Sequence, residues 1–436
     1  MSNQHHSHHT NHKNHSSDLV PELRFPEFEG EWEEIRYGEI YSFKTTNSLS
    51  RDALNYNSGR VKNIHYGDIH TKFNSLFDIT EEKVPFINEE INISRFKDEH
   101  YVKEGDLVVA DASEDYADIG KTIEIINLNN ELVLAGLHTF LARRDSDKII
   151  KGFSSFLMTT RAVRLEVMRI AQGTKVLGLS TKRLAEVPLC LPKPKEQQKI
   201  ASFLTAVDKR IQLLEEKKKN LERYKQGAMQ QIFSQEIRFK DEHGNAFPDW
   251  EEKKLGELAT FSKGKGISKS DIDEFGELEC IRYGELYTEY SEIIDVVKSR
   301  TKLEKAELII SEANDVIIPA SGETQLDIAT ASCVLRSGIA LGGDLNIIKS
   351  NTNGVFMSYY LNNARKKEIA SLAQGISVVH LYASQLKTLT IALPTKTEQQ
   401  KIATFLSAID KAIEKVGKQV EETQQFKKGL LQKMCV

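Results

Sequence analysis

One stretch of this chain occurs twice, and the repeat constrains the fold more than any other feature of the sequence. The two copies begin at Leu191 and Leu393 and read LPKPKEQQKIASFLTAVDKRI and LPTKTEQQKIATFLSAIDKAI. Glu398 lies 202 positions after Glu196, and the offset stays constant along both copies. Two unrelated helices would not share an identical EQQKIA run in one register, so we interpret the stretch as an internal duplication.

Both copies carry apolar residues in steps of four and three, which predicts a long amphipathic helix in each. These residues are Ile200, Leu204, Val207, Ile211, Leu214, Leu221, Ala228 and Ile232 in the first copy, and Ile402, Leu406, Ile409, Ile413, Val416, Val420, Leu430 and Met434 in the second. A seam of this kind predicts that the two helices mate with each other. Thr397 and Gln400 have the spacing of a capping box, so we expect the second helix to begin at Thr397.

The segments between the helices repeat as well, in the same order. The only two tryptophans, Trp32 and Trp250, fall in register within two related stretches. IHYGDIHT returns as IRYGELYT, GLHTFL (136–141) faces GDLNII (343–348), and AQGTKV returns as AQGISV. Runs such as DLVVA and LNIIK predict strands, whereas the pattern of residues 153–170 and of residues 356–372 predicts a helix in each. We therefore expect an α/β chain of two duplicated mixed α/β domains, separated by two long helices that form an antiparallel coiled coil with pseudo-two-fold symmetry.

The repeat divides the chain into five expected segments. Residues 1–20 hold a His-rich tail that we expect to be disordered, and a solvated leader or purification tag fits it better than a metal-binding segment. A first globular domain at 21–190 precedes a first long helix at 191–235. A second domain at 236–392 precedes a second long helix at 393–436.

The composition is that of a soluble globular protein, with 40% hydrophobic and 28% charged residues. Neither a signal peptide nor an apolar run long enough to span a membrane is present, so we expect a cytoplasmic protein. The four cysteines lack C-x-x-C spacing, which argues against a zinc ribbon. A net charge of −4 argues against a chain that grips nucleic acid alone over a large area. Residues 193–225 are nevertheless basic, with ten Lys and Arg against five Asp and Glu.

No catalytic motif stands out. GKGISKS lacks the spacing of a phosphate-binding loop, and no G-x-G-x-x-G follows an expected strand. The signature of amino-methylases, an Asn or Asp followed by two prolines and an aromatic residue, is missing too. Pro248, Asp249, Glu251 and Lys253 contain the letters of a nuclease site but lie too close together to converge on a metal. We therefore expect a binding protein with no catalytic residues and no metal site.

Two polar stretches, FKTTNSLSRDALNYNSGR from Phe43 and FSKGKGISKSDIDEFGE from Phe261, are the candidate binding loops. Their basic residues suit contacts to phosphates, while Asn, Ser and Thr suit hydrogen bonds to base edges. The alternative is an ordinary solvated loop. The candidate DNA-binding residues are Lys44, Arg51, Arg60, Lys263, Lys265 and Lys269.

The layout resembles the specificity subunit of type I restriction-modification enzymes. The resemblance is carried by the LP-x-x-x-E-Q-Q-K-I starts at Leu191 and Leu393, by the helices behind them, and by the Q-G loops at Gln172 and Gln374. It covers nearly everything from Pro21 onward. It implies two target recognition domains, each reading one half of a split double-stranded DNA site.

The resemblance also implies partners. The long helices would dock two methylase subunits, with Glu196, Gln197, Glu398 and Gln399 as candidate subunit-binding residues, and restriction (motor-nuclease) subunits would join. AdoMet, ATP and Mg²⁺ would belong to the partners, and this chain would be non-catalytic with no membrane partner. Two alternatives stay open: a coiled-coil scaffold that tethers two protein-binding domains, and a self-sufficient nuclease or methylase with a degenerate motif.

Overall fold

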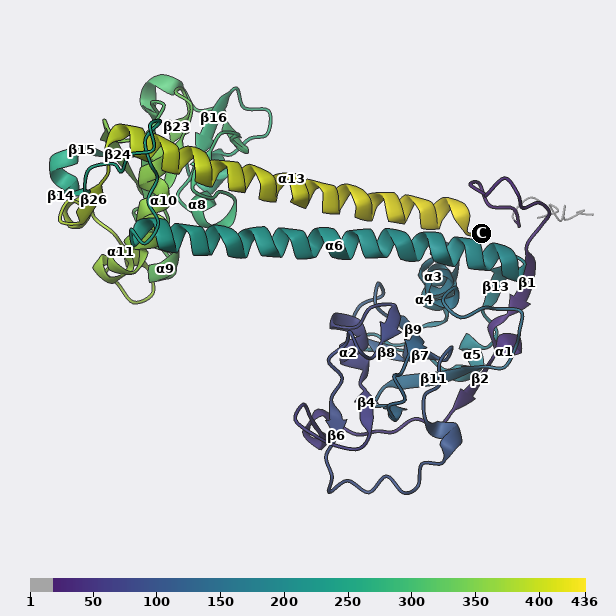
Figure 1. Cartoon of the computed structure of the whole chain (residues 1–436). Coiled ribbons are helices and arrows are strands. Elements are labelled where there is room, and N and C mark those ends of the chain that lie inside the picture. The colour runs from purple at the N-terminus through teal and green to yellow at the C-terminus, as the bar shows by residue number, and fades with distance from the viewer. Residues whose placement is uncertain (1–18) are drawn as a thin grey trace, which may run out of the picture. The chain divides into compact units, whose positions relative to one another are not determined.

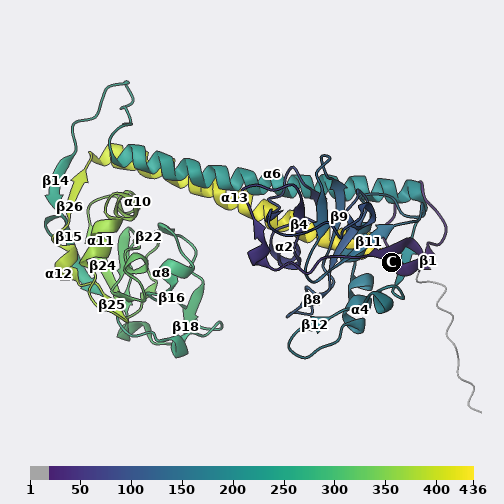
Figure 2. The same cartoon turned by 90° about the horizontal axis from the view of Figure 1, so that it is seen from below.

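The structure is a computed structural model of the chain, and it describes residues 19–436. The expected disorder of residues 1–20 therefore lies almost wholly outside the described residues. The chain divides into two compact units: one ends at Leu213 and takes in Gln419–Val436, and the other is Leu214–Lys418. Each unit holds one globular domain, part of the long helix that follows it, and part of the other long helix (Figures 1 and 2).

The first globular domain is built on two sheets. The five-stranded sheet has the order β2 (Tyr41–Lys44), β11 (Thr139–Arg144), β7 (Leu107–Ala110), β9 (Thr122–Asn127) and β5 (Leu76–Asp78). The four-stranded sheet has the order β10 (Val133–Ala135), β4 (Lys62–Ile64), β6 (Phe86–Ile87) and β3 (Leu54–Asn55). The pairs β5–β9 and β4–β10 are parallel and the others antiparallel. Such a mixed order joins strands that are distant in the sequence.

The second domain repeats the order of the five-stranded sheet, whereas the parallel pair of the four-stranded sheet lies at its edge in the first domain and in its middle in the second. Its five-stranded sheet has the order β15 (Ala259–Lys263), β24 (Leu345–Ser350), β20 (Asp315–Pro319), β22 (Ser332–Val334) and β17 (Ile293–Ile294). Its four-stranded sheet has the order β18 (Ser299–Thr301), β16 (Leu278–Ile281), β23 (Ala340–Leu341) and β19 (Ile309–Ile310). The expected duplicated α/β class is confirmed.

The helices expected at 153–170 and 356–372 are each a pair of shorter helices. In the first domain α3 (Ser154–Thr159) is followed by α4 (Arg161–Ile170), and in the second α10 (Gly354–Ala364) is followed by α11 (Lys366–Leu372). Thr160 stands between α3 and α4 in an extended conformation, and its hydroxyl accepts a hydrogen bond from Val163 N. The threonine thus caps α4, as short polar side chains do at helix starts. The apolar period continued through this break, so the sequence pattern did not reveal it.

The ends of each domain meet in a two-stranded sheet. β1 (Glu33–Arg36) pairs with β13 (Pro188–Leu191), and β14 (Glu251–Lys254) pairs with β26 (Thr390–Leu393), both antiparallel. The strand that ends each domain then leads within a few residues into the long helix. The start of each domain is therefore fixed beside the start of the helix that follows it.

The two expected long helices are present as α6 (Pro194–Phe233) and α13 (Lys396–Met434). Proline suits the first helical position of α6, where its missing N–H has no partner to lose. The expected start of α13 at Thr397 is wrong by two residues, because the cap is Thr395, whose hydroxyl accepts from Glu398 N at 3.4 Å. A threonine two positions earlier satisfies the same unpaired N–H groups.

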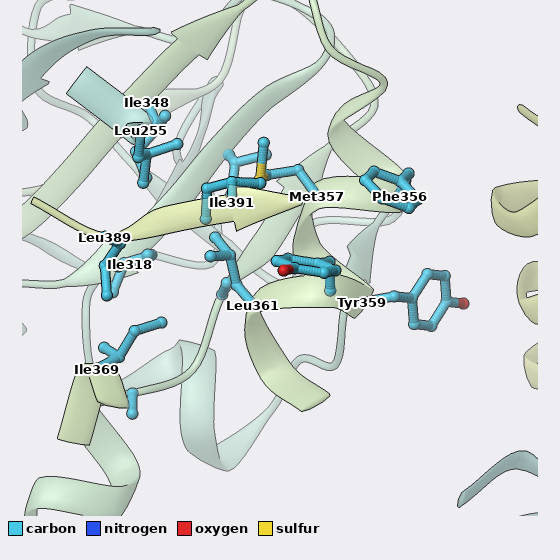
Figure 3. Close-up of a cluster of buried hydrophobic side chains, with 14 of the residues drawn as sticks. Leu255, Ile318, Ile348, Phe356, Met357, Tyr359, Leu361, Ile369, Leu389 and Ile391 are labelled. Atoms are coloured by element: carbon cyan, nitrogen blue, oxygen red, sulfur yellow. The ribbon is translucent and has the colours of Figure 1, made fainter. Parts of the chain in front are cut away.

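The end of each long helix is buried in the core of the unit that holds the other copy's domain. Leu430, Met434 and Cys435 of the α13 end pack in one core with Phe153, Phe156 and Leu157 of the first domain. Met229, Ile232 and Phe233 of the α6 end pack in one core with Phe356, Met357 and Tyr360 of the second. Figure 3 shows part of this second core, with Met357 and Leu361 of α10 beside Ile391 of β26.

An ion pair joins α6 to α13 within each unit. In the first unit Lys427 Nζ lies 2.5 Å from Asp208 Oδ1, and in the second Lys225 Nζ lies 2.7 Å from Asp410 Oδ1. Asp410 lies 202 positions after Asp208, and Lys427 the same distance after Lys225, so the two pairs are copies of one interaction. In the second unit Lys218 also lies beside Gly417. Partner numbers thus fall along α13 as they rise along α6, and the helix segments run antiparallel.

Each lysine of these pairs also lies over an aromatic ring. Lys427 Nζ is 5.6 Å from the ring centroid of Phe156, and Lys225 Nζ is 5.1 Å from that of Tyr359. The second unit adds a hydrogen bond from the Tyr359 hydroxyl to Asp410 and an ion pair of 2.8 Å between Lys225 and Glu292. Although burial lowers it, the two carboxylates raise the pKa of Lys225 above its ordinary value. Charge and packing therefore favour the same helix register.

Replacing Lys225 tests the strength of this pairing. Lys225→Met leaves Glu292 and Asp410 close together without a cation, in a site where their side chains are 13% and 25% exposed. We expect the free energy of unfolding of the second unit to fall by roughly 3 kcal/mol, as when one partner of a buried pair is removed. Urea unfolding of a Trp32→Phe background, in which Trp250 reports on this unit, measures it. Lys219→Met, at an exposed position of α6, is the control, and equal midpoints for the two variants would contradict the prediction.

Glu124 of β9 is a buried carboxylate that holds the start of α3. Its Oε1 accepts from Gly152 N at 2.6 Å and its Oε2 from Ser155 N at 2.9 Å. Burial raises the pKa of Glu124 to about 7, and these two hydrogen bonds oppose the rise. The second domain has Cys333 at the matching position of β22, so this carboxylate belongs to the first unit only.

The raised pKa predicts a pH-dependent stability. The folded state binds the Glu124 proton more tightly than the unfolded chain does. The contribution of Glu124 to the free energy of unfolding therefore falls as the pH rises from about 4.5 to about 7, and then levels off. Over that range we expect the free energy of unfolding of the wild type to fall by on the order of 3 kcal/mol relative to that of Glu124→Gln. Urea unfolding at several pH values, read from Trp32 in a Trp250→Phe background, measures the difference. A difference that does not change with pH would refute the prediction.

Candidate functional site

An arginine near the start of each domain clamps the start of the long helix. Arg24 donates from Nε and Nη2 to the two carboxylate oxygens of Glu196, both at 2.8 Å. Arg238 makes the same pair with Glu398, at 3.3 and 2.9 Å, and Trp250 Nε1 donates to Glu398 at 3.2 Å. Glu196 is 2% exposed and Glu398 is fully buried. Paired arginine–carboxylate forks of this kind fix orientation as well as position.

The neighbouring glutamines bind backbone groups. Gln197 accepts from Ile150 N at 2.9 Å and donates to the carbonyls of Lys148 and Pro192 at 2.7 and 2.8 Å. Gln399 accepts from Asn353 N at 3.0 Å and donates to Pro394 O at 2.8 Å. The repeated E-Q pair thus joins the helix start to the segment just before α3 in one domain and α10 in the other.

The four residues that were expected to bind a partner subunit are buried, and that role stays a prediction. Glu196, Gln197, Glu398 and Gln399 are all less than 5% exposed, and their polar atoms are used within their own units. Their side chains hold the helix start to its own domain. The repeat of E-Q in the sequence therefore reflects how the helix is attached to its domain.

Small residues on the next turns of α13 leave a surface cavity. It has a volume of about 280 Å³ and is lined by Asn353, Val355, Gln400, Ala403, Thr404, Ser407, Ala408 and Lys411. The matching α6 positions also carry small residues, Ala201, Ser202, Thr205 and Ala206. This face of the helix start lets another backbone approach closely, and it is repeated.

The Q-G loops have the same backbone in both domains. Gly173 and Gly375 have φ values of 132° and 130°. A Cβ there would lie 2.0 Å from Val176 O in one loop and 2.1 Å from Val378 O in the other, so only glycine fits. The tips are open to solvent, with Val176 56% and Ile376 fully exposed.

Arg51 serves the interior of its domain. Its Nη1 and Nη2 lie 2.6 and 2.9 Å from the two oxygens of Asp68, a side chain with no exposed surface, and Lys72 Nζ lies 2.8 Å from Asp68 Oδ1. Burial alone would raise the pKa of Asp68, but the bonds from Arg51 and Lys72 lower it below its ordinary value. Arg51 and Lys269 begin matching 3-10 turns, η1 (Arg51–Ala53) and η3 (Lys269–Asp271), so they stand at equivalent places in the two domains.

The other expected DNA-binding residues lie near the surface. Lys263 Nζ is 3.2 Å from Asp344 Oδ1, with both side chains about half exposed or more. Arg60, Lys265 and Lys269 are exposed, and Lys44 is half-buried. Arg60 lines a cavity of about 630 Å³ with Asn88, Asn92, Ser94 and other residues. No side chain in the described part of the chain forms an ion pair with Lys44, Arg60, Lys265 or Lys269.

A cluster that the sequence reading missed surrounds Tyr66 at the start of α2 (Tyr66–Thr71). The ring centroids of His65, His70 and His138 lie 4.7, 5.8 and 5.2 Å from that of Tyr66. His138 Nδ1 is 3.3 Å from Asp111 Oδ1, and His70 Nε2 is 3.0 Å from Ala112 O. Burial, followed by the charge of Arg51, lowers the pKa of His65 to about 4. The signal was present in IHYGDIHT, but residues 111 and 138 join it only through the fold.

The second domain places different side chains on the matching backbone. Asp344 (φ 59°) corresponds to His138 (φ 53°), both in the left-handed region. The carbonyl of His138 accepts from Asp111 N at 3.0 Å, and that of Asp344 accepts from Ala320 N at 2.7 Å. The expected alignment of GLHTFL with GDLNII is therefore wrong by one residue at this point.

Within residues 19–436, no three His, Cys, Asp or Glu side chains are grouped so as to hold a metal ion. In the same range, no helix is both long and apolar enough to cross a membrane.

Comparison with known proteins gives one family. The model of the type I restriction modification DNA specificity domain matches residues 29–223 and again 248–422. The putative type I restriction enzyme MjaX specificity subunit of Methanocaldococcus jannaschii is 25% identical over 90% of this chain and 89% of its own. The MjaVIII specificity subunit of the same organism is 29% identical over 46% of each chain, so the match spans about half that relative's length.

Two solved structures share the fold. The S subunit of a type I restriction-modification system from M. genitalium has a TM-score of 0.56 and 13% identity, covering 96% of this chain and 99% of its own. A chain from a study of complex assembly and conformational transition of the type I R-M system has a TM-score of 0.54 and 15% identity, covering 92% and 96%. With two copies of the family domain that together span most of its length, the chain belongs to the specificity subunits of type I restriction-modification systems.

Proposed function

We propose that this chain is the DNA-reading subunit of its complex and recognises a bipartite double-stranded site, one half with each globular domain. The observation that carries the proposal is the duplication of one scaffold with different exposed side chains. The arginine clamp and the helix ion pair both occur in each copy of the scaffold. The exposed positions at 138 and 344 differ. Two copies of one reader with different contact residues suit two half-sites of different sequence.

Catalysis would then belong to other subunits. The repeated small-residue face at the starts of α6 and α13 suits two identical partners, which we take to be methylase subunits, with restriction subunits joining them. In this scheme AdoMet, ATP and Mg²⁺ are bound by the partners, and the complex works on DNA in the cytoplasm. The chain itself transfers no group and cleaves no bond.

A protein scaffold is the second candidate. The exposed apolar tips of the Q-G loops, at Val176 and Ile376, are compatible with protein partners on both domains. The two functions predict different outcomes in cells, because a tether would not set which DNA bases are methylated.

Methylome sequencing of cells that carry the chain with its methylase tests the proposal. Deleting the chain should abolish a bipartite methylation motif. Replacing residues 236–392 with the matching domain of a relative should change one half of that motif and leave the other intact. A motif that persists without the chain would favour the scaffold, whereas a swap that alters both halves would show that the domains read the site jointly.

A further inference from the structure

The strongest clue to which residues read DNA is the contrast between the two domains on one backbone. α2 corresponds to α8 (Glu285–Thr288): Thr71 and Thr288 each donate to the carbonyl of a glycine four residues earlier, Gly67 and Gly284. Both turns keep the tyrosine that precedes this glycine. The side chains around that tyrosine differ: His65, His70, Asp111 and His138 in the first domain stand where Arg282, Tyr287, Ala320 and Asp344 stand in the second.

The backbone below these side chains is held rigidly in both domains. Asp68 is fully buried under Arg51 and Lys72, and Glu285 at the matching place is 6% exposed and accepts from Arg282 N at 2.9 Å. The N–H groups of Leu179 and Leu381 donate to the carbonyls of Asp111 and Ala320 at 2.9 and 3.0 Å. A fixed frame with exchangeable side chains is what a reading surface requires, because base contacts depend on exact placement of donors and acceptors.

The side chains at the left-handed backbone position, His138 in the first domain and Asp344 in the second, offer different chemistry. In the first domain His138 is half exposed and Asp111 is 22% exposed, so both can meet a ligand. When the His138 Nδ1–H donates to Asp111, the other ring nitrogen, Nε2, is left for an outside partner. In the second domain Asp344 presents carboxylate oxygens beside the Lys263 ammonium, with the two side chains 48% and 64% exposed.

Such groups suit base edges in the major groove. A carboxylate accepts from the exocyclic amino group of cytosine, and an adjacent lysine donates to guanine O6 or N7. Imidazole can donate or accept, according to its protonation state and to the bond made by its other nitrogen. Phosphates, in contrast, would be repelled by Asp111 and Asp344. Bases therefore fit this position better than the DNA backbone does.

Resting on the function proposed above, we propose that His138 with Asp111 in the first domain, and Asp344 with Lys263 in the second, contact base edges and set the identity of a base pair in their respective half-sites. The exposed Lys265 and Lys269 then contact phosphates. Arg51, bound to the buried Asp68, supports the frame.

A reciprocal exchange of side chains tests this inference. His138→Asp with Asp111→Ala gives the first domain the side chains that Asp344 and Ala320 supply in the second, and Asp344→His with Ala320→Asp does the reverse. Each pair already occurs on an equivalent left-handed backbone, so both exchanges are expected to fold; urea unfolding and co-purification with the methylase check this. The readout is selection of duplexes from a pool randomised in both half-sites, with the chain and methylase complex, together with methylome sequencing.

We expect each exchange to change or relax base preference in one half-site only, and to weaken binding to the wild-type site roughly tenfold or more, as for one lost base contact. Binding to unrelated duplex should stay the same. The control, Lys265→Ala with Lys269→Ala, should weaken binding to all duplexes alike and lower the salt slope by up to about two units.

Three results would overturn the inference. The selected sequences could stay unchanged, both half-sites could change together, or specific and unrelated duplexes could lose affinity equally. If either exchanged chain fails to fold, the single variants Asp111→Ala and Lys263→Ala give the same readouts, because each removes one partly exposed side chain and leaves the core unchanged. A wild-type complex that selects no bipartite sequence would instead refute the proposed function, which keeps the two failures apart.

Discussion

The structure depends on the burial of each long helix's C-terminal end in the unit that holds the other copy's domain. Met229, Ile232 and Phe233 complete the core beneath α10, and Leu430, Met434 and Cys435 complete the core beneath α3. The Asp–Lys pair, with its aromatic ring, sets the helix register at the same place. An apolar contact provides the driving force, and the ion pair makes a slip along the seam costly, because a slip would leave partly buried charges without partners. Neither domain is therefore complete with its own following helix alone.

Duplication separates what the fold needs from what recognition needs. The arginine clamp, the buried E-Q pair, the helix ion pair and the Q-G glycine recur because each satisfies a requirement of the backbone or the core. Around Tyr66 and Tyr283 the backbone recurs while the side chains do not. A buried group that fails to repeat, such as Glu124, is a local solution within one domain. An exposed group that fails to repeat on a fixed frame is a candidate for specificity, and His138 and Asp344 are of this kind.

Much of the architecture followed from the sequence, because repeats and apolar periodicity are local signals. The long helices and the duplicated α/β domains were predicted and are confirmed. The break at Thr160 and the cap at Thr395 were missed, because each depends on a single hydrogen bond from a backbone N–H to a threonine hydroxyl. The candidate site was harder. Basic residues in polar loops identified Arg51, which supports the interior, and Lys263, which pairs with Asp344. Glu196 and Gln197 were expected from the family resemblance to bind a partner; in the structure they hold the helix start to its domain, and partner binding stays a prediction.

The sequence by itself determined the family, the two-fold repetition and the helix seam, because these lie in contiguous patterns that survive without knowledge of contacts. Only the tertiary structure decided which residues meet. Residues 65–70, 111 and 138 are distant in the chain, and they come together because β7 pairs with β11 and α2 packs against β7. The equivalence of His138 and Asp344 was likewise established by backbone hydrogen bonds, which a sequence alignment does not contain. Recognition depends on such juxtapositions, and the chain order alone does not specify them.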